Sequence, residues 1–292
     1  DGNFPFGATY IVPALPAKTF GTVGTGSGTF LKGTLEKQTN LSITVRAFDT
    51  GGNQSITPAQ MITVVPDATA PRILSSAPDD RLLALGVREI RLTADEVLNP
   101  AFLDAARFSL TDHGSDFTPG GDDDAPVSLD SVHIENGRTI VVKIAGDEPL
   151  PQSLYTLVVE PETVVDLRGN QMAVVFNLSF ATIDAFPDGS AAWLSRQDGD
   201  WDEIGNWLGG QVPDASTDAI LDVPGLDVTI FVRDRRSVAR LNLAENLVIS
   251  EFGELTLRGD SALSGTVTFE DESQLRVSGS QGETAAVMLS GD

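Results

Sequence analysis

Short runs in which apolar and polar residues alternate recur along most of the chain, and turn-forming residues separate them. Alternation with a period of two is typical of β-strands that are buried on one face. Residues 41–48 and 154–159 are two such runs, and each precedes the pattern Asp-x-x-Gly-Asn, at residues 49–53 and 166–170. Each pattern is followed by another apolar run, which gives a strand, a tight turn and a last strand. The alternation therefore predicts an all-β chain that contains two β-sandwiches.

A second pattern, with a longer period, occupies the C-terminal third of the chain. Apolar positions there recur twenty residues later: Leu247, Ile249, Leu255 and Leu257 correspond to Val267, Phe269, Leu275 and Val277. Val287 and Leu289 are expected to begin a third copy. Paired apolar positions at a fixed period are typical of a β-solenoid, in which each coil stacks on the previous one. We expect equivalent residues to stack directly, and the solenoid to continue beyond Asp292.

Two Pro-bearing linkers, at residues 67–71 and 184–188, separate these patterns. The predicted regions are an incomplete sandwich at 1–66, a sandwich at 67–185, and a Trp-containing opening segment with solenoid coils at 186–292. A short helix is expected within the second region, over residues 100–106, because a Pro stands at its first turn.

Composition narrows the classes of partner. Asp and Glu outnumber Lys and Arg by 42 to 19, for a net charge of −23. A chain this acidic is not expected to bind the phosphate backbone of nucleic acid. It has no apolar stretch of the ~20 residues that a membrane-spanning helix needs. The chain has no Cys and does not begin with Met, which fits a processed or partial bacterial exported protein, or a cytosolic one.

Specific motifs resemble those of known modules, and they favour the exported alternative. Residues 35–55 resemble the second half of a fibronectin type III domain, whose V-x-A-x-D-x-x-G-N-x-S ending is completed here by Ser55. The whole of 67–185 resembles the bacterial Ig-like domain of S-layer and other surface proteins. The segments that carry this second resemblance are 70–78, 89–97, 139–144, 150–159, 164–170 and 180–182. The resemblances imply two Ig-like sandwiches followed by a right-handed-type β-solenoid.

The opening segment of the third region contains three tryptophans. Trp193, Trp201 and Trp207 stand with Asn206 and Pro213 in an order that resembles the start of β-helical passenger regions in large bacterial exported proteins. Tryptophans at this spacing could form a platform on which sugars stack, but more often they fill a core or cover the open end of a solenoid.

Calcium is the ligand for which the sequence offers candidate residues. In the expected topology, Asp67, Glu96 and Asp166 converge at the end of the second sandwich where the chain enters it. Ca²⁺ prefers carboxylate, amide and carbonyl oxygens. The alternative is that Asp166 only accepts hydrogen bonds from backbone N–H groups of its own turn, and both alternatives stay open.

A second candidate calcium site begins like an EF-type loop. Asp198, Asp200 and Asp202 have the D-x-D-x-D spacing, but Glu203 stands where such a loop needs Gly and Gly209 where it needs a bidentate Glu. No cofactor other than Ca²⁺ is expected.

Catalytic residues are scarce in this sequence. With His113 and His133 as the only histidines, no Ser-His-Asp triad and no zinc site is expected. The chain is therefore predicted to be a non-enzymatic structural or spacer region of a large secreted or cell-surface bacterial protein. Its expected partners are other segments of the same long chain and polysaccharide or cell-surface components. The alternatives are an accessory part of an extracellular carbohydrate-active β-helix enzyme and a carbohydrate-binding adhesin.

Overall fold

The computed structural model describes residues 6–11, 39–48, 53–56, 58–65, 67–278 and 287–289. Every long element in these residues is a β-strand, and the helical elements are 3₁₀ turns of three residues each. The predicted all-β fold, with sandwich-like sheets and a solenoid of about three turns, is confirmed. Contacts divide the chain into two compact units, Asp1–Thr69 and Ala70–Asp292, which are described separately. No helix in the described residues is both long and apolar enough to cross a membrane.

The first unit contains one antiparallel sheet built around a long central strand. Its strands are β1 (Phe6–Ile11), β2 (Thr39–Phe48), β3 (Gln54–Ile56) and β4 (Gln60–Val64). Strand β2 pairs with each of the other three. The predicted turn after Phe48 begins at Asp49, which lies outside the described residues, but Phe48 pairs with Gln54 on either side of it.

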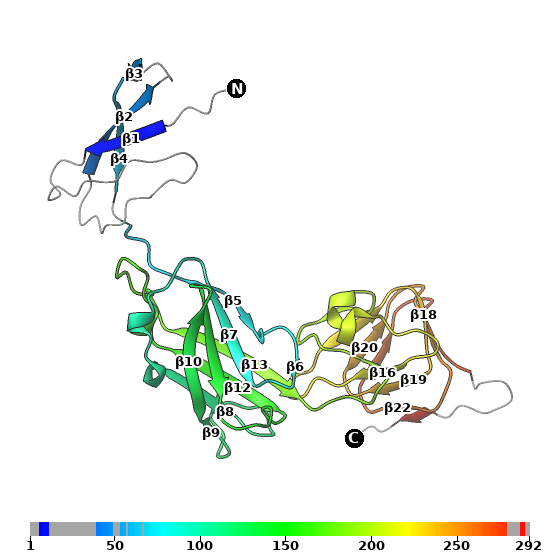
Figure 1. The fold of residues 1–292 in the computed structure, drawn as a ribbon. Helices are drawn as coiled ribbons and strands as arrows, with labels where there is room; N and C mark the ends of the chain where they lie inside the picture. The colour runs from blue at the N-terminus through cyan, green and yellow to red at the C-terminus, as the bar shows by residue number, and fades with distance from the viewer. Residues whose placement is uncertain are drawn as a thin grey trace. The chain divides into compact units, whose positions relative to one another are not determined.

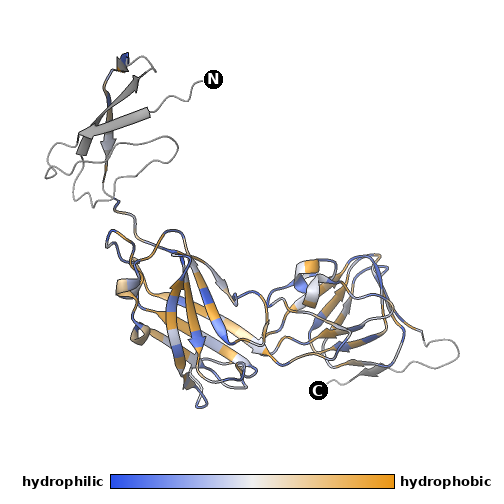
Figure 2. Cartoon of the chain, in the orientation of Figure 1, coloured by the Kyte–Doolittle hydropathy of each residue, from blue (hydrophilic) through white to orange (hydrophobic). Residues whose placement is uncertain are grey.

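The second unit begins with a sandwich of two sheets (Figure 1). One sheet has the order β10-β11-β7-β5, and the other has the order β6-β13-β12-β8-β9. The strands are β5 (Ile73–Ala77), β6 (Ala84–Leu85), β7 (Glu89–Ala94), β8 (Phe108–Asp112), β9 (Ala125–Val127), β10 (Leu129–Glu135), β11 (Thr139–Ile144), β12 (Ser153–Val159) and β13 (Phe176–Ile183). Alternate residues along β7 and along most of β12 are buried. Figure 2 shows apolar and polar bands along the strands of the sandwich. The inward residues build one separate core, which includes Ile90, Leu92, Leu157 and Phe180.

The expected helix over 100–106 is wrong in its type. Two 3₁₀ turns, Pro100–Phe102 and Ala105–Arg107, stand in its place. The side chains of Asn99 and Asp104 each accept a hydrogen bond from the backbone N–H two residues later. Each cap starts a new turn, so the intervening Leu103 is extended and no continuous helix forms.

The rest of the second unit is a parallel β-solenoid with three faces. The first face contains β14 (Ser190–Ala192), β16 (Asp218–Leu221), β19 (Arg240–Leu243), β22 (Ser261–Leu263) and β25 (Val287–Leu289). The second contains β15 (Gly199–Asp200), β17 (Thr229–Val232), β20 (Asn246–Ile249) and β23 (Val267–Phe269). The third contains β18 (Arg235–Val238), β21 (Glu254–Leu257) and β24 (Gln274–Val277). Each strand pairs in parallel with its equivalent in the next coil.

The predicted stacking of the coils is confirmed for both pairs of strands. Leu247 and Ile249 pair with Val267 and Phe269, and Leu255 and Leu257 pair with Leu275 and Val277. The expected third copy is wrong in its register, because Val287 and Leu289 pair with Ser261 and Leu263 of β22. The predicted repeat had two strands per coil and placed Val287 and Leu289 after β23 on the second face. The solenoid has three strands per coil, so β25 extends the first face.

Close approach of neighbouring coils requires glycine at one corner. A Cβ atom on Gly265 would lie 2.0 Å from the carbonyl oxygen of Glu245 in the previous coil. Such a distance is far below van der Waals contact, so any other residue would force the two coils apart.

Candidate functional site

The three tryptophans lie inside the second unit, at the start of the solenoid. Trp193 and Trp201 have no exposed surface, and Trp207 is 2% exposed. The ring of Trp207 contacts both others edge to face, with centroids 5.3 Å from Trp193 and 4.9 Å from Trp201. Its Nε1 donates a hydrogen bond of 2.6 Å to the carbonyl oxygen of Trp201. Buried rings cannot act as an exposed sugar platform, so this arrangement supports the core role.

Backbone pairing fastens the tryptophans to the solenoid. The N–H groups of Trp193 and Trp201 donate to the carbonyl oxygens of Ile220 and Phe231, which belong to the first complete coil. Gly199 passes so close to the cluster that a Cβ atom there would lie 3.2 Å from the Trp193 ring. The segment therefore covers the N-terminal end of the coils, a position that a solenoid must protect from water.

A short segment within the sandwich, residues 81–85, pairs with backbone of both the sandwich and the solenoid region, and we call it the junction segment. Its first half pairs with the tryptophan segment, residues 193–207. Leu82 forms an antiparallel bridge with Ser195, and the N–H of Leu83 donates to the carbonyl oxygen of Leu194 at 2.7 Å. Its second half is β6, which pairs in parallel with the end of β13 in the sandwich. Figure 1 shows β6 where the two parts meet. One stretch of backbone thus pairs both with the tryptophan segment and with a sheet of the sandwich.

Side chains continue this connection into the core. The hydrophobic cluster that fills the solenoid also contains Leu83, Leu154, Ala181 and Ile183 from the sandwich. At the edge of the junction, Arg196 donates from Nη1 to the carbonyl oxygen of Asp80 at 3.1 Å. Burial lowers the pKa of Arg196, and the charge of Asp80 acts in the opposite direction. Four sandwich residues consequently belong to the solenoid core, while the sandwich keeps a separate core of its own.

The three predicted calcium ligands come together at the start of the sandwich. One carboxylate oxygen each of Asp67, Glu96 and Asp166 lies within 4.8 Å of the others. Asp67 is exposed, Glu96 is half-buried and Asp166 is buried. Carboxylates at this separation repel one another, and a cation between them removes that repulsion. The donor set consists of oxygens alone and therefore fits Ca²⁺ better than a softer metal.

Asp166 also performs the turn chemistry that was the alternative. Its Oδ1 accepts from the N–H groups of Arg168 and Asn170 at 2.7 and 2.8 Å, and its Oδ2 accepts from Asn170 Nδ2 at 2.7 Å. Burial acts to raise the pKa of Asp166, but the hydrogen bonds from Asn170, Arg168 and Gly169 lower it overall. Gly169 has φ of +93°, which the turn requires. Asp166 is therefore charged and held in place, whether or not an ion binds.

The second candidate calcium site is arranged differently. Asp198 Oδ1 accepts from the N–H of Thr229 at 2.7 Å. Asp200 forms an ion pair with Arg233, and Asp202 forms one with Arg236 at 2.6 Å. The three carboxylates thus have separate partners, and calcium binding by this loop stays a prediction.

The sequence did not reveal the environment of His113. Its side chain is 7% exposed, with Nδ1 3.0 Å from Asp124 Oδ1 and Nε2 2.9 Å from Thr156 Oγ1. Asp124 in turn accepts from the N–H of Gly120, and this bond, together with His113, lowers the pKa of Asp124. These bonds fix the 114–124 loop against β12. His133, by contrast, is half-buried on β10, where its Nε2 lies 3.4 Å from Glu135 Oε1.

Comparison with known proteins finds a family match for the sandwich region. Residues 67–182 match the family model described as a bacterial Ig-like domain. No curated protein matches the chain. Solved structures that resemble it include the N-terminal part of the bacterial S-layer protein SbsC, at 19% identity and a TM-score of 0.31 over 47% of this chain and 28% of that one. Another is PcoC, a methionine-rich copper resistance protein from Escherichia coli, at 20% identity and a TM-score of 0.31 over 39% of this chain and 99% of that one. The chain thus spans less than a third of the S-layer structure it resembles.

Proposed function

We propose that this chain is a non-enzymatic structural segment of a secreted or cell-surface bacterial protein, in which the Ig-like sandwich caps the solenoid and fixes its direction. The observation that carries the proposal is that sandwich residues at the junction complete the solenoid core. A flexible linker between two independent modules would leave each with its own closed core and a polar surface between them. The junction segment and the buried tryptophans instead resist bending, which suits a part that transmits force or holds other segments at a distance.

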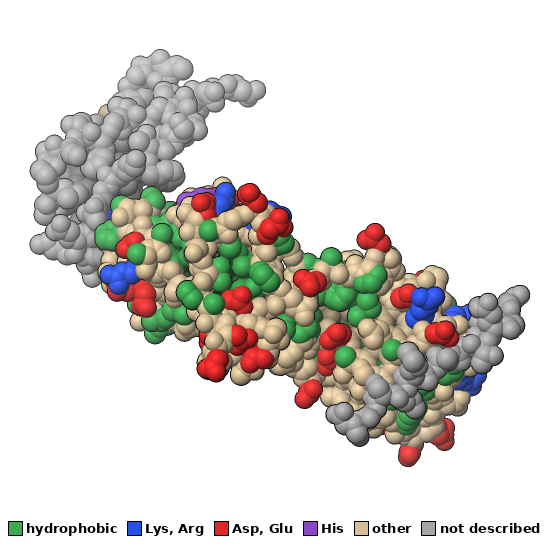
Figure 3. Space-filling model, turned by 90° about the horizontal axis from the view of Figure 1, so that it is seen from below, with side chains coloured by type: hydrophobic (Ala, Val, Ile, Leu, Met, Phe, Trp, Pro, Cys, Tyr) green, Lys and Arg blue, Asp and Glu red, His purple; other side chains and the backbone are tan. Residues whose placement is uncertain are grey.

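The bacterial Ig-like match of 67–182 supports the surface location, and the strongly acidic surface supports a role outside nucleic-acid binding. Acidic side chains are spread over both parts of the second unit in Figure 3. His113 is buried with its ring nitrogens on Asp124 and Thr156, and His133 contacts Glu135 of its own strand, so both histidines have partners that suit a structural role.

Distance measurement between two spin labels tests the rigidity directly. The chain has no Cys, so the exposed substitutions Ser109→Cys on β8 and Asn242→Cys on β19 introduce the only labelling sites. A narrow distance distribution by pulsed electron paramagnetic resonance is expected. The same labels in a Trp207→Ala background serve as the comparison, and we expect that distribution to broaden. A broad distribution in the otherwise unchanged chain would contradict the proposal.

Calcium binding by Asp67, Glu96 and Asp166 is a second candidate function, and their close approach supports it. An ion bound to the folded form raises the melting temperature by mass action. Glu96→Gln removes one charge and leaves the Asp166 turn intact, and Glu148→Gln at an exposed position is the matched control. Millimolar Ca²⁺ should raise the melting temperature of the unchanged chain and the control more than that of Glu96→Gln. Equal responses in all three proteins would reject the site.

One hollow on the solenoid bears on the carbohydrate-binding alternative. It has a volume of about 400 Å³, and its lining includes exposed Phe252 together with Glu254 and Glu272. Glu254 lies 3.3 Å from Arg276 and 3.9 Å from Arg235, so its charge is already paired. Binding of soluble polysaccharides that is lost in Phe252→Ala would favour this alternative over a purely structural role.

A further inference from the structure

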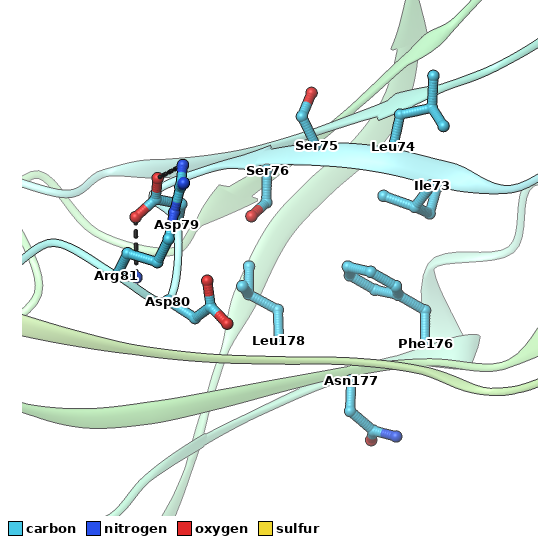
Figure 4. A pocket seen from close by; sticks show the side chains of 10 residues that line it. All are labelled: Ile73, Leu74, Ser75, Ser76, Asp79, Asp80, Arg81, Phe176, Asn177 and Leu178. Atoms are coloured by element: carbon cyan, nitrogen blue, oxygen red, sulfur yellow. Dashed lines mark hydrogen bonds and ion pairs between the residues drawn. The ribbon is translucent and has the colours of Figure 1, made fainter. Parts of the chain in front are cut away.

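A groove runs along one open side of the Ig-like sandwich, between the edge strand β5 of one sheet and β13 of the other (Figure 4). It has a volume of about 430 Å³. Ile73 and Ser76 project into it from β5, and Phe176 and Leu178 project into it from β13. None of its lining residues belongs to the acidic cluster, and none is a tryptophan.

Both strands that flank the groove leave backbone groups available for pairing. Within the described residues, β5 pairs with β7 on one side and with no strand on the other. Strand β13 pairs with β12 along its length, but with β6 only at Thr182 and Ile183, so residues 176–181 have an open edge. Alternate N–H and C=O groups of an edge strand point outward and can accept another strand.

The side chains around the groove are suited to a strand with alternating apolar residues. A β-bulge between Ile73 and Ser75 turns Leu74 and Ser75 away from the groove, and Leu74 is 68% exposed. Ile73 and Phe176 are only partly buried and rest against the sandwich core. A strand added beside β5 would cover them with every second side chain, which is how strand addition combines backbone affinity with side-chain specificity.

Charge discriminates between the occupants that the groove could accept. In residues 67–185, Asp and Glu outnumber Lys and Arg by 20 to 8. At one end of the groove Asp79 pairs with Arg81 at 3.1 Å, and the carboxylate of exposed Asp80 points toward Leu178. A second copy of this acidic chain would be repelled, whereas a cationic segment would be attracted.

We propose that the groove between β5 and β13 binds a short extended segment of a partner protein, with alternating apolar side chains and flanking basic residues, by strand addition to β5. The proposal goes beyond the structural role of the junction and does not depend on it.

Binding of a defined peptide to the full chain tests this. The probe is a fluorescein-labelled peptide of sequence Lys-Val-Thr-Val-Thr-Val-Lys with blocked ends, and its binding is followed by fluorescence anisotropy. We expect the peptide with Glu in place of both Lys residues to bind at least tenfold more weakly. A peptide methylated on alternate backbone nitrogens should bind no better than that, because it cannot complete the ladder.

Two matched variants locate the binding. Ser76→Arg fills the groove and adds a like charge to the probe, whereas Ser179→Arg places the same side chain on the exposed face of β13. Ser76→Arg should weaken binding at least tenfold, and Ser179→Arg should leave it unchanged, with both variants melting cooperatively like the parent.

Several results would overturn the proposal. They are absence of binding at millimolar peptide, equal affinity of the Ser76→Arg and Ser179→Arg variants for the probe, and equal affinity of the unchanged chain for the probe and the methylated peptide. Sedimentation equilibrium provides the remaining one: a dimer that Ser76→Arg dissociates would make a second copy the occupant in place of a cationic partner.

Discussion

The sandwich and the solenoid of the second unit solve the problem of burying a core in different ways. The sandwich closes two sheets, antiparallel apart from the short β6, over its own residues, and within the part of the chain that the structure describes its core contains no solenoid side chain. The solenoid stacks parallel strands, and its core includes Leu83, Leu154, Ala181 and Ile183 from the sandwich. Dependence between the two parts is therefore expected to run in one direction.

This asymmetry follows from the architecture. A coil of a solenoid has apolar surface and unpaired backbone on both of its open sides, so its first coil needs a cap. Here the tryptophan segment and the junction segment form that cap, and strand β13 of the sandwich pairs with β6 of the junction segment. A change in the cap or in the sandwich should consequently affect the coils, while a change in the coils should not affect the sandwich.

Truncating Trp207 should have the largest effect. Trp207→Ala removes both ring contacts and the hydrogen bond to Trp201, and loss of a buried aromatic residue costs about 3–5 kcal/mol. Hydrogen exchange should accelerate throughout β16 to β21, while the amides of β7, β11 and β12 stay protected. Trp207→Phe retains an aromatic ring, so its hydrogen-exchange rates in β16 to β21 should lie between those of the unchanged chain and those of Trp207→Ala. Equal loss of protection in the sandwich would contradict one-way dependence.

A pair of leucine truncations tests the direction of the dependence. Leu157 fills the sandwich core and Leu255 fills the solenoid core, and neither is exposed. Each substitution by Ala should cost about 2–5 kcal/mol. Because every tryptophan lies in the solenoid cap, tryptophan fluorescence reports that part of the chain. Leu157→Ala should lower the urea midpoint of the fluorescence transition, whereas Leu255→Ala should leave protection of the sandwich amides unchanged. Sandwich destabilisation by Leu255→Ala would show two-way coupling.

How far each part could be predicted from sequence depended on the regularity of its pattern. The stacking of Leu255 on Leu275 follows from an unbroken period of twenty. The first face of the solenoid was missed, because Ser261 stands twenty residues after Leu241 and only Leu243 has an apolar equivalent, Leu263. Coils before residue 246 were missed as well, since Ile230 pairs with Leu247, at an offset of seventeen.

Contacts across long sequence separations set a second limit. The approach of Asp67, Glu96 and Asp166 could be expected from sandwich topology, because strands of known order fix which ends meet. No local pattern indicates that Leu83 reaches the solenoid core, since its partners lie more than a hundred residues away. The pairing of residues 81–83 with the tryptophan segment joins two modules and is a property of neither motif alone.

Protonation of one buried carboxylate is expected to have the smallest effect on stability. It should make the stability of the solenoid and that of the sandwich depend differently on pH. Glu245 is 5% exposed, and its oxygens accept from the N–H groups of Val223 and Val228 in the previous coil, at 2.7 and 3.0 Å. Burial raises the pKa of Glu245, the two backbone bonds lower it, and the charges of Asp222 and Asp227 raise it further. In the sandwich, by contrast, the pKa values of Asp124, Glu135 and Asp166 are lowered.

A raised pKa in the folded state means that the contribution of Glu245 to stability is fully present below its unfolded pKa and is lost as pH rises through the folded value. Lowering the pH from about 7 to about 5 should therefore strengthen the solenoid through this residue, before the sandwich carboxylates begin to bind protons. Glu245→Gln cannot titrate, so the urea midpoint of tryptophan fluorescence in the unchanged chain, relative to this variant, should be higher at the lower pH. The shift should be smaller than that of either leucine truncation. A difference between the two proteins that is the same at both pH values would show that Glu245 does not titrate in this range, and the contrast with the sandwich would then rest on packing alone.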